Sequence, residues 1–215
     1  MIQVESLAFN SFQVNCYMVW DETGRCLVID PCFYSPEEEK LFEDFLFQRR
    51  LEITGQVNTH CHVDHVLGVG YIKSNYNLPF RAHSEESLLV PNVPMMGELF
   101  GFRVEPLDRI DIFISDREKI AVGDHQLLAL HVPGHSPGSL SFYSRDGGFV
   151  ITGDALFASG IGRTDLPGGD YDTLIRSIHE QLLVLPTETI VYPGHGPSST
   201  IGEEKAYNPF LNMSE

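Results

Sequence analysis

The chain has 215 residues, of which 42% are hydrophobic and 20% charged, so it is long enough to bury a core without disulfides. A formal net charge of −16 repels nucleic-acid phosphates, and we expect no nucleic-acid partner. The N-terminal residues lack the basic and apolar segments of a secretory signal, and no apolar run approaches the roughly 20 residues of a membrane-spanning helix. Four cysteines without zinc-ribbon or CxxC spacing are typical of reduced thiols, so we predict a cytoplasmic protein that does not associate with membranes.

The first elements of the chain are a hairpin and a helix. Short β-branched runs at 13–20 and 25–30 flank an ETG turn and predict two paired strands. Residues 35–50 predict a helix, because Ser35 suits the N-cap, Pro36 suits the first position, and glutamates follow in the first turn. A strand within 51–60 and a short helix at 66–76 come next.

The second half of the chain is again rich in short strands. We expect residues 84–115 to be irregular, since they contain Pro91, Pro94 and a Met–Met pair. The remaining predicted elements are strands at 118–123, 125–132, 139–145, 147–154 and 189–195 and a helix at 170–185. This order predicts a layered α/β protein, and we treat residues 1–215 as a single domain.

A dense histidine cluster follows the strand within 51–60, in the sequence NTHCHVDHVLG. His60 and His62 are two residues apart, so they share a face of an extended segment, and Asp64 and His65 follow directly. Imidazole and carboxylate groups together suit zinc, iron, manganese or cobalt. The cluster therefore predicts a metal site rather than a polar surface loop.

Three further candidate ligands stand at predicted strand ends, each directly after a glycine: His135, Asp154 and His195. A glycine lets the backbone turn tightly and present the next side chain. With the cluster they give seven candidate ligands, enough for two metal ions.

The other histidines lack this context and are expected at the surface or in the core: His83, His125, His131 and His179. His131 is the closest of them to the candidate ligands, because it precedes His135 at the same strand end. Cys61 lies between two candidate ligands but points away from them on an extended segment, so we interpret it as a packing residue.

With these residues identified, the sequence resembles the metallo-β-lactamase fold superfamily over nearly its whole length. The resemblance rests on THCHVDH followed by His135, Asp154 and His195 in that order, and on VIDP at 28–31, whose aspartate supports the site in that family. It implies an αββα sandwich, with two sheets face to face, helices outside and the metals at one edge.

The resemblance also implies a ligand set for two divalent ions, zinc first, with iron or manganese as alternatives. His60, His62 and His135 would hold one ion. Asp64, His65 and His195 would hold the other. Asp154 would bridge the two ions together with a water or hydroxide, and Asp64 would also orient this nucleophile.

Within the superfamily, the chain is most similar to short bacterial relatives of glyoxalase II, the hydroxyacylglutathione hydrolases. The shared stretches are GIGRTDLPGGDYDTLIRSI at 160–178 and YPGHGPSSTIGEEKAYNPFL at 192–211. Full-length glyoxalase II has a C-terminal helical extension that binds glutathione, and this sequence ends about 20 residues after His195, without room for it. The tyrosine that follows the last histidine in the longer enzymes is also replaced by Gly196-Pro197.

The resemblance therefore implies hydrolysis of S-D-lactoylglutathione or a related small-molecule thioester by a metal-bridging hydroxide. A thiolate leaves without a strong general acid, and the sequence offers no separate one. Arg163 is predicted to bind a substrate carboxylate, with a structural pair to Asp165 as the equal alternative. Residues 91–102 are expected either to form an apolar wall over the pocket or simply to pack.

Other functions fit the sequence less well. Persulfide dioxygenases share the ligand pattern and a GRTD stretch, and would bind one iron through His60, His135 and Asp154, but GPSS after the last histidine departs from their pattern. A nuclease would need a basic face, and an exported lactamase would need a signal peptide. A non-enzymatic metal-binding module would not need seven convergent ligands. The metal identity, the thiol carrier and the oligomeric state are not encoded in any pattern of the sequence.

Overall fold

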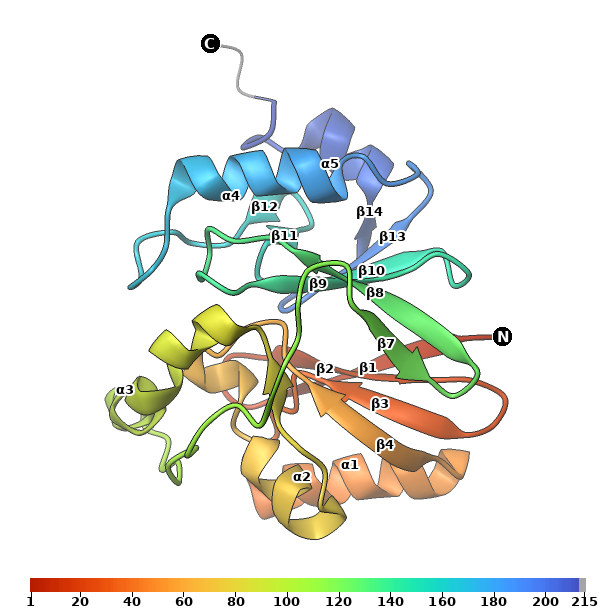
Figure 1. Cartoon of the computed structure of the whole chain (residues 1–215), viewed down its shortest axis with the longest axis vertical. Helices are drawn as coiled ribbons and strands as arrows, with labels where there is room; N and C mark the ends of the chain where they lie inside the picture. Colours follow the sequence, from red (N-terminus) through yellow and green to blue (C-terminus); the bar gives the residue numbers. More distant parts are fainter. Residues whose placement is uncertain (213–215) are drawn as a thin grey trace.

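Two β-sheets face each other in the computed structural model, which describes residues 1–212, and helices cover both outer faces (Figure 1). The first sheet has the order β1-β2-β3-β4, with β1 Gln3–Phe9, β2 Val14–Trp20, β3 Arg25–Ile29 and β4 Glu52–Val57. The second has the order β14-β13-β10-β9-β8-β7, with β7 Lys119–Val122, β8 His125–His131, β9 Leu140–Ser144, β10 Phe149–Gly153, β13 Ile190–Pro193 and β14 Ser199–Thr200. The predicted αββα sandwich is confirmed.

The helices form the outer layers and the short elements connect them. Next to the first sheet lie α1 Pro36–Arg49 and α2 Val69–Tyr76, and next to the second lie α4 Tyr171–Ser177 and α5 Ile201–Tyr207 (Figure 1). The remaining elements are α3 Val93–Phe100, β5 Arg81–Ala82 paired with β6 Ile112–Phe113, β11 Leu156–Phe157 paired with β12 Gly160–Ile161, short 3₁₀ turns at Val63–His65, Ser84–Leu88 and Val90–Asn92, and a π-helical turn at Ile178–Leu182.

Every residue of β2 is buried, because both faces of its sheet are covered. Tyr17 and Val19 point into the core between the sheets, whereas Cys16 and Met18 point into the core beneath α1. This is the period-two alternation of a strand with apolar layers on each side. A third core lies between the second sheet and α4, and a fourth lies beneath α3.

The predicted helix at 35–50 forms as α1 with the expected N-terminus. The Ser35 side chain accepts a hydrogen bond from the Glu38 backbone N–H at 3.3 Å, and the Glu38 carboxylate accepts one from the Ser35 N–H at 3.4 Å. Pro36 occupies the first turn, where a missing N–H costs nothing. Arg50 ends the helix in the left-handed conformation.

Two expectations from the sequence need correction, and further elements were not predicted. Residues 84–115 are not irregular throughout, since α3 forms within them, with Pro94 in its first turn and Gly101 (φ 84°) at its C-terminal end. The helix predicted at 170–185 is α-helical only over α4 and then widens into the π-helical turn. β1 and α5 carried no prediction. Within residues 1–212 no helix is long and apolar enough to cross a membrane.

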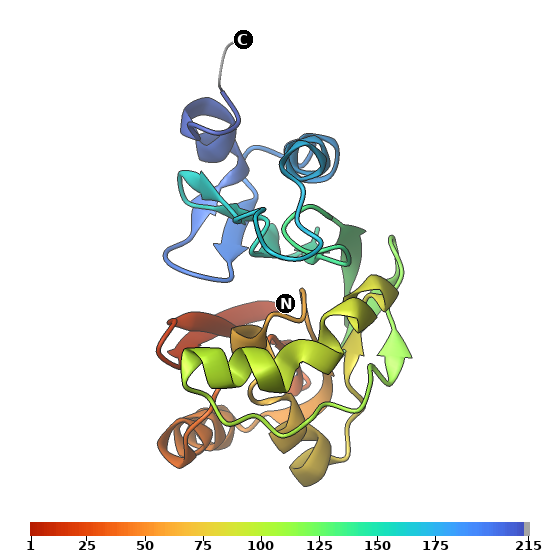
Figure 2. The ribbon, with the colours of Figure 1, turned by 90° about the vertical axis from the view of Figure 1, so that its left-hand side faces the viewer.

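The candidate ligands follow the C-terminal ends of β4, β8, β10 and β13, and β3 ends beside them at Asp30. β3 runs parallel to β4, and β10 runs parallel to β13, so within each pair the following loops leave the same edge. Figure 2, turned toward the left side of Figure 1, brings α3 to the front of the first-sheet half. The treatment of the chain as one domain stays a prediction.

Candidate metal centre

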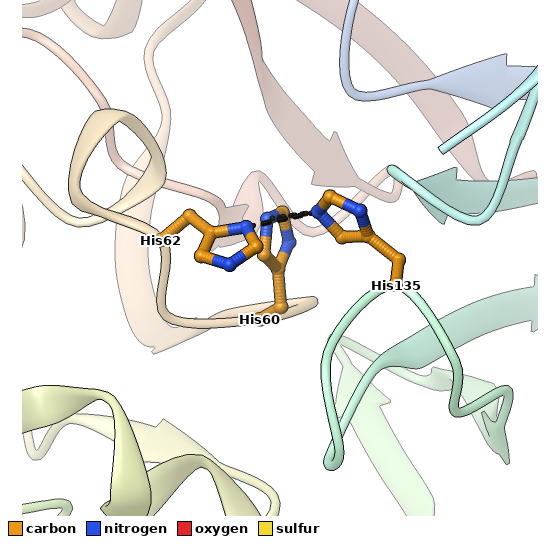
Figure 3. A group of neighbouring side chains, drawn as sticks. All are labelled: His60, His62 and His135. Atoms are coloured by element: carbon orange, nitrogen blue, oxygen red, sulfur yellow. Dashed lines mark hydrogen bonds between the residues drawn. The ribbon is translucent and has the colours of Figure 1, made fainter. Parts of the chain in front are cut away.

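Three histidine rings meet between the loop after β4 and the loop after β8 (Figure 3). His62 Nδ1 lies 2.9 Å from His135 Nε2, and His135 Nε2 lies 3.3 Å from His60 Nε2. The dashed lines in Figure 3 join these nitrogens, which face one another across the three rings. Such a convergence of imidazole nitrogens is the arrangement that holds a divalent transition metal.

A second group forms beside the first. His65 Nε2 lies 3.3 Å from His195 Nε2, and Asp64 Oδ2 lies 3.5 Å from His195 Nε2. The candidate ligand atoms of Asp64, His65 and His195 all lie within 4.8 Å of one another. This is again a set of nitrogen and oxygen donors around one point.

Asp154 stands between the two groups. Its Oδ2 atom lies 3.7 Å from His135 Nε2 of the first group and 3.5 Å from His195 Nε2 of the second. Its Oδ1 atom lies 3.4 Å from His65 Nε2. The structure thus brings all seven sequence-predicted ligands together, with Asp154 in the bridging position, while metal coordination by them stays a prediction.

Hydrogen bonds behind the rings fix their orientation. The Nδ1 atom of His65 faces Asp30 Oδ2 at 2.9 Å, that of His135 faces the Arg163 carbonyl at 2.8 Å, and that of His195 faces the Phe12 carbonyl at 3.0 Å. Because each partner is an acceptor, each Nδ1 donates its proton, and each Nε2 is left to face the centre. Asp30, expected as a support, also accepts from the Thr59 N–H and hydroxyl, both at 2.6 Å.

The side chains fit a pair of divalent cations. Asp154 Oδ1 is buried without a hydrogen-bond partner and lies between the two groups. Burial, followed by neighbouring imidazoles, lowers the pKa of His62 to about 3 and that of His60 well below its usual range, so both are neutral donors. Burial opposes a charge on His195, yet Asp154 and Asp64 raise its pKa to about 9, which shows that these carboxylates attract positive charge.

The glycines before the ligands are needed for close packing. A Cβ atom on Gly194 would collide with the Asp154 carboxylate, and one on Gly153, which has a φ of 52°, would collide with the Thr59 side chain. The strand ends therefore approach each other too closely for any larger residue.

Glu86 is a site residue that the sequence analysis missed. It is fully buried, and its carboxylate accepts hydrogen bonds from the Cys61 N–H at 2.6 Å, the Ser136 hydroxyl at 2.6 Å and the Gly138 N–H at 2.8 Å. It thereby ties the loop of His60 and His62 to the loop of His135. A single glutamate beside the exposed Glu85 carries no sequence signal for this role.

Two asparagines were missed in the same way. The Asn10 side chain donates to the Asp64 carbonyl at 3.0 Å, and the Asn15 side chain donates to the Pro193 and Gly196 carbonyls, both at 3.0 Å. These bonds fasten the start of the first sheet to the loops that carry Asp64 and His195.

The remaining histidines lie outside the centre, as expected. His131 stacks on His83, with ring centroids 4.2 Å apart and planes within 16°. His131 Nε2 lies 2.9 Å from the Pro137 carbonyl. Cys61 packs in the core beneath α3, and burial raises the pKa of its thiol well above the usual range, so its interpretation as a packing residue agrees with its position.

A pocket of about 340 Å³ opens onto the centre. Asp64, His135 and His195 lie on one side of it, and Met96 and Phe100 of α3 lie on the other. Residues 91–102 thus form a wall of the pocket, one of the two arrangements considered for them. Arg163 reaches the rim, but its guanidinium makes two hydrogen bonds of 2.7 Å to Asp165, the structural pair weighed against a substrate contact.

Comparison with known proteins agrees with this geometry. Residues 10–195 match the family described as the metallo-beta-lactamase superfamily. Hydroxyacylglutathione hydrolase GloC of Haemophilus influenzae is 36% identical over 218 residues, covering 98% of this chain and 99% of that protein. The chain therefore belongs to the metallo-beta-lactamase superfamily, and it resembles the short glyoxalase II-like members.

Two further similarities bear on the metal and the reaction. The crystal structure of TTHA1623 in a di-iron-bound form aligns with a TM-score of 0.86 and 34% identity. The alignment covers 96% of this chain and 100% of that one. The mitochondrial persulfide dioxygenase ETHE1 of Homo sapiens is 32% identical over 204 residues, covering 92% of this chain and 71% of that protein. One similar structure thus binds two irons, and the two curated relatives are named for different reactions.

Proposed function

We propose that the protein is a metal-dependent thioester hydrolase of the glyoxalase II type that acts in the cytoplasm on a small-molecule substrate. The observation that carries the proposal is the pair of ligand groups joined at Asp154 and open to one pocket. The similarity to hydroxyacylglutathione hydrolase GloC supports thioester hydrolysis, with S-D-lactoylglutathione as the first substrate to assay.

The residues of the centre divide the work of hydrolysis. His60, His62 and His135 would hold one divalent ion, zinc in the first instance; Asp64, His65 and His195 would hold the other. When bound, two such ions lower the pKa of water toward about 7 and polarise the substrate carbonyl. Asp64 faces the pocket and accepts a hydrogen bond from the attacking water, which orients it.

The leaving group explains why a thioester suits this site better than an amide. Among the described residues that line the pocket, the titratable side chains are candidate ligands, the buried Cys61 and the paired Arg163. None of these stands free to protonate an amine. A thiolate, whose conjugate acid has a pKa of about 8.5, departs without a proton donor.

Hydrolysis of S-D-lactoylglutathione by the purified protein, with its metal content measured, tests the proposal. We expect turnover with about two metal ions per chain, and loss of that turnover in Asp154→Asn. Asp146→Asn is the matched control, because Asp146 is an exposed turn residue far along the sheet from the centre. A metal-loaded protein that hydrolyses no thioester contradicts the proposal.

The alternative is a mononuclear iron persulfide dioxygenase, which the similarity to ETHE1 favours. That activity would use His60, His135 and Asp154 and leave the second group without a metal. The completeness of that second group, down to the hydrogen bonds behind His65 and His195, favours the hydrolase. One iron per chain together with sulfite production from glutathione persulfide would decide for the dioxygenase.

A further inference from the structure

Much of the pocket lining is hydrocarbon. We call this surface the apolar wall; its members are Phe12, Leu89, Val93, Met96, Phe100 and Leu166. Phe12 and Phe100 keep 40% and 43% of their surface exposed. Large apolar side chains left open in a concave site beside reactive groups are typical of a surface that a ligand covers.

Aromatic contacts hold the apolar wall in place. The Phe12 ring meets Phe100 edge to face with centroids 5.4 Å apart, and it lies 5.9 Å from Phe102. Phe102 in turn packs on Tyr34 at 5.0 Å, and the Tyr34 hydroxyl accepts a hydrogen bond from the Arg103 N–H at 2.8 Å. The wall is therefore fastened to the first sheet, not merely laid over the pocket.

Phe12 also joins the apolar wall to the metal centre. Its carbonyl accepts the hydrogen bond from His195 Nδ1, while its ring faces the pocket. Phe12 thus brings an exposed apolar side chain beside His195 of the metal centre.

The pocket offers little to an anionic group. Among its described lining residues Arg163 is the only lysine or arginine, and its Nε and Nη2 already donate to Asp165. Asp64 and Asp154 would hold divalent ions, so the other positive charge of the pocket would lie at the metal centre. A carboxylate placed on the apolar wall would lose its hydration and gain no free cation.

We infer that the apolar wall holds an uncharged hydrocarbon group of the thioester, aliphatic or aromatic, so that the preferred substrate is more apolar than S-D-lactoylglutathione. The inference deepens the proposed function and rests on it for the reaction, but the binding surface itself stands apart from turnover. The hydrocarbon can belong to the acyl side or to the thiol side of the thioester, and the experiment separates the two.

The first test is binding of non-hydrolysable thioethers, S-methyl to S-hexyl N-acetylcysteamine, to the metal-loaded protein by calorimetry. We expect affinity to rise about threefold for each added methylene, since each buried methylene contributes a nearly constant free energy. Met96→Gln and Phe100→Gln should each flatten this rise. Leu99→Gln is the matched control, because Leu99 lies on the same helix, is 72% exposed and is not part of the apolar wall; it should leave the rise unchanged.

Turnover of two thioester series then assigns the hydrocarbon to one side. One series lengthens the acyl chain on N-acetylcysteamine, and the other keeps acetyl and lengthens an alkyl thiol; the series whose kcat/KM rises identifies the side on the apolar wall. An S-hexyl ligand that binds no more tightly than S-methyl, or a rise equal in Met96→Gln, Phe100→Gln and Leu99→Gln, overturns the inference. A rise in binding without turnover of any thioester supports the apolar wall and contradicts the hydrolase proposal alone.

Discussion

The ligand loops and the apolar wall face the same pocket but are built differently. Short hydrogen bonds to buried carboxylates lie behind the ligands. Asp30 accepts from Thr59 and His65, and Glu86 accepts from both ligand loops. The apolar wall has aromatic edges and exposed phenylalanine side chains instead. Directional hydrogen bonds hold the ligand atoms in one geometry, whereas apolar contacts tolerate replacement of one apolar group by another of different shape.

This contrast separates chemistry from selectivity. Substitutions among the ligand loops should abolish the reaction or weaken the fold, and substitutions in the apolar wall should change which substrate is preferred. The predictions below test that separation, beginning with the largest expected effect.

His195→Ala should remove the second metal ion and lower kcat about a thousandfold, or about 4 kcal/mol. The reason is that one of the two ions that would activate the attacking water is lost. Metal analysis and hydrolysis assays measure both effects. His131→Ala is the control, since His131 stacks on His83 outside the centre. Full activity with one metal ion in His195→Ala would mean that the second ligand group is not used.

Glu86→Ala should destabilise the metal-free protein by about 3 kcal/mol, because three buried donors lose their acceptor. Urea denaturation followed by circular dichroism gives the free energy of unfolding. Glu85→Ala, at the exposed neighbour, should change it by less than about 0.5 kcal/mol. Equal unfolding midpoints for the two variants would show that Glu86 does not tie the loops together.

Asp30→Asn should weaken metal binding about tenfold to a hundredfold, since the amide no longer provides the charged acceptor that orients His65. Competition with a chromophoric chelator measures the affinity. Asp21→Asn is a matched control, because Asp21 is a buried carboxylate that accepts hydrogen bonds from Thr23 and Asp124 on another part of the molecule. The same loss in both variants would indicate a general effect on folding.

Asp165→Ala should lower KM for a carboxylate-bearing thioester about threefold by releasing the Arg163 guanidinium toward the rim. Arg163→Ala should change that KM by less than about twofold, because the paired cation is not free to bind. Steady-state kinetics on the same substrate compare the two. A rise of tenfold or more in Arg163→Ala would restore the substrate-binding role predicted for Arg163.

The sequence predicted the ligands more completely than the elements around them. His60, His62, Asp64 and His65 are adjacent in the chain, and the later ligands carry a glycine before them, so each leaves a local signal. The local signal for α3 was weaker, because Pro94 at its start and Gly101 at its end were outweighed by Pro91 just before it. Glu86, Asn10 and Asn15 left none, since their partners lie from 25 to 181 residues away in the chain.

The sequence by itself therefore determined the superfamily, the layered fold and the seven candidate ligands, because spacing and strand patterns are local properties of the chain. Only the tertiary structure decided that Asp154 stands between two ligand groups, that Glu86 joins two ligand loops, and that Asp165 occupies Arg163. It also decided that Phe12 reaches across to Phe100 to form the apolar wall. These contacts follow from how the two sheets pack, and no local pattern records that packing.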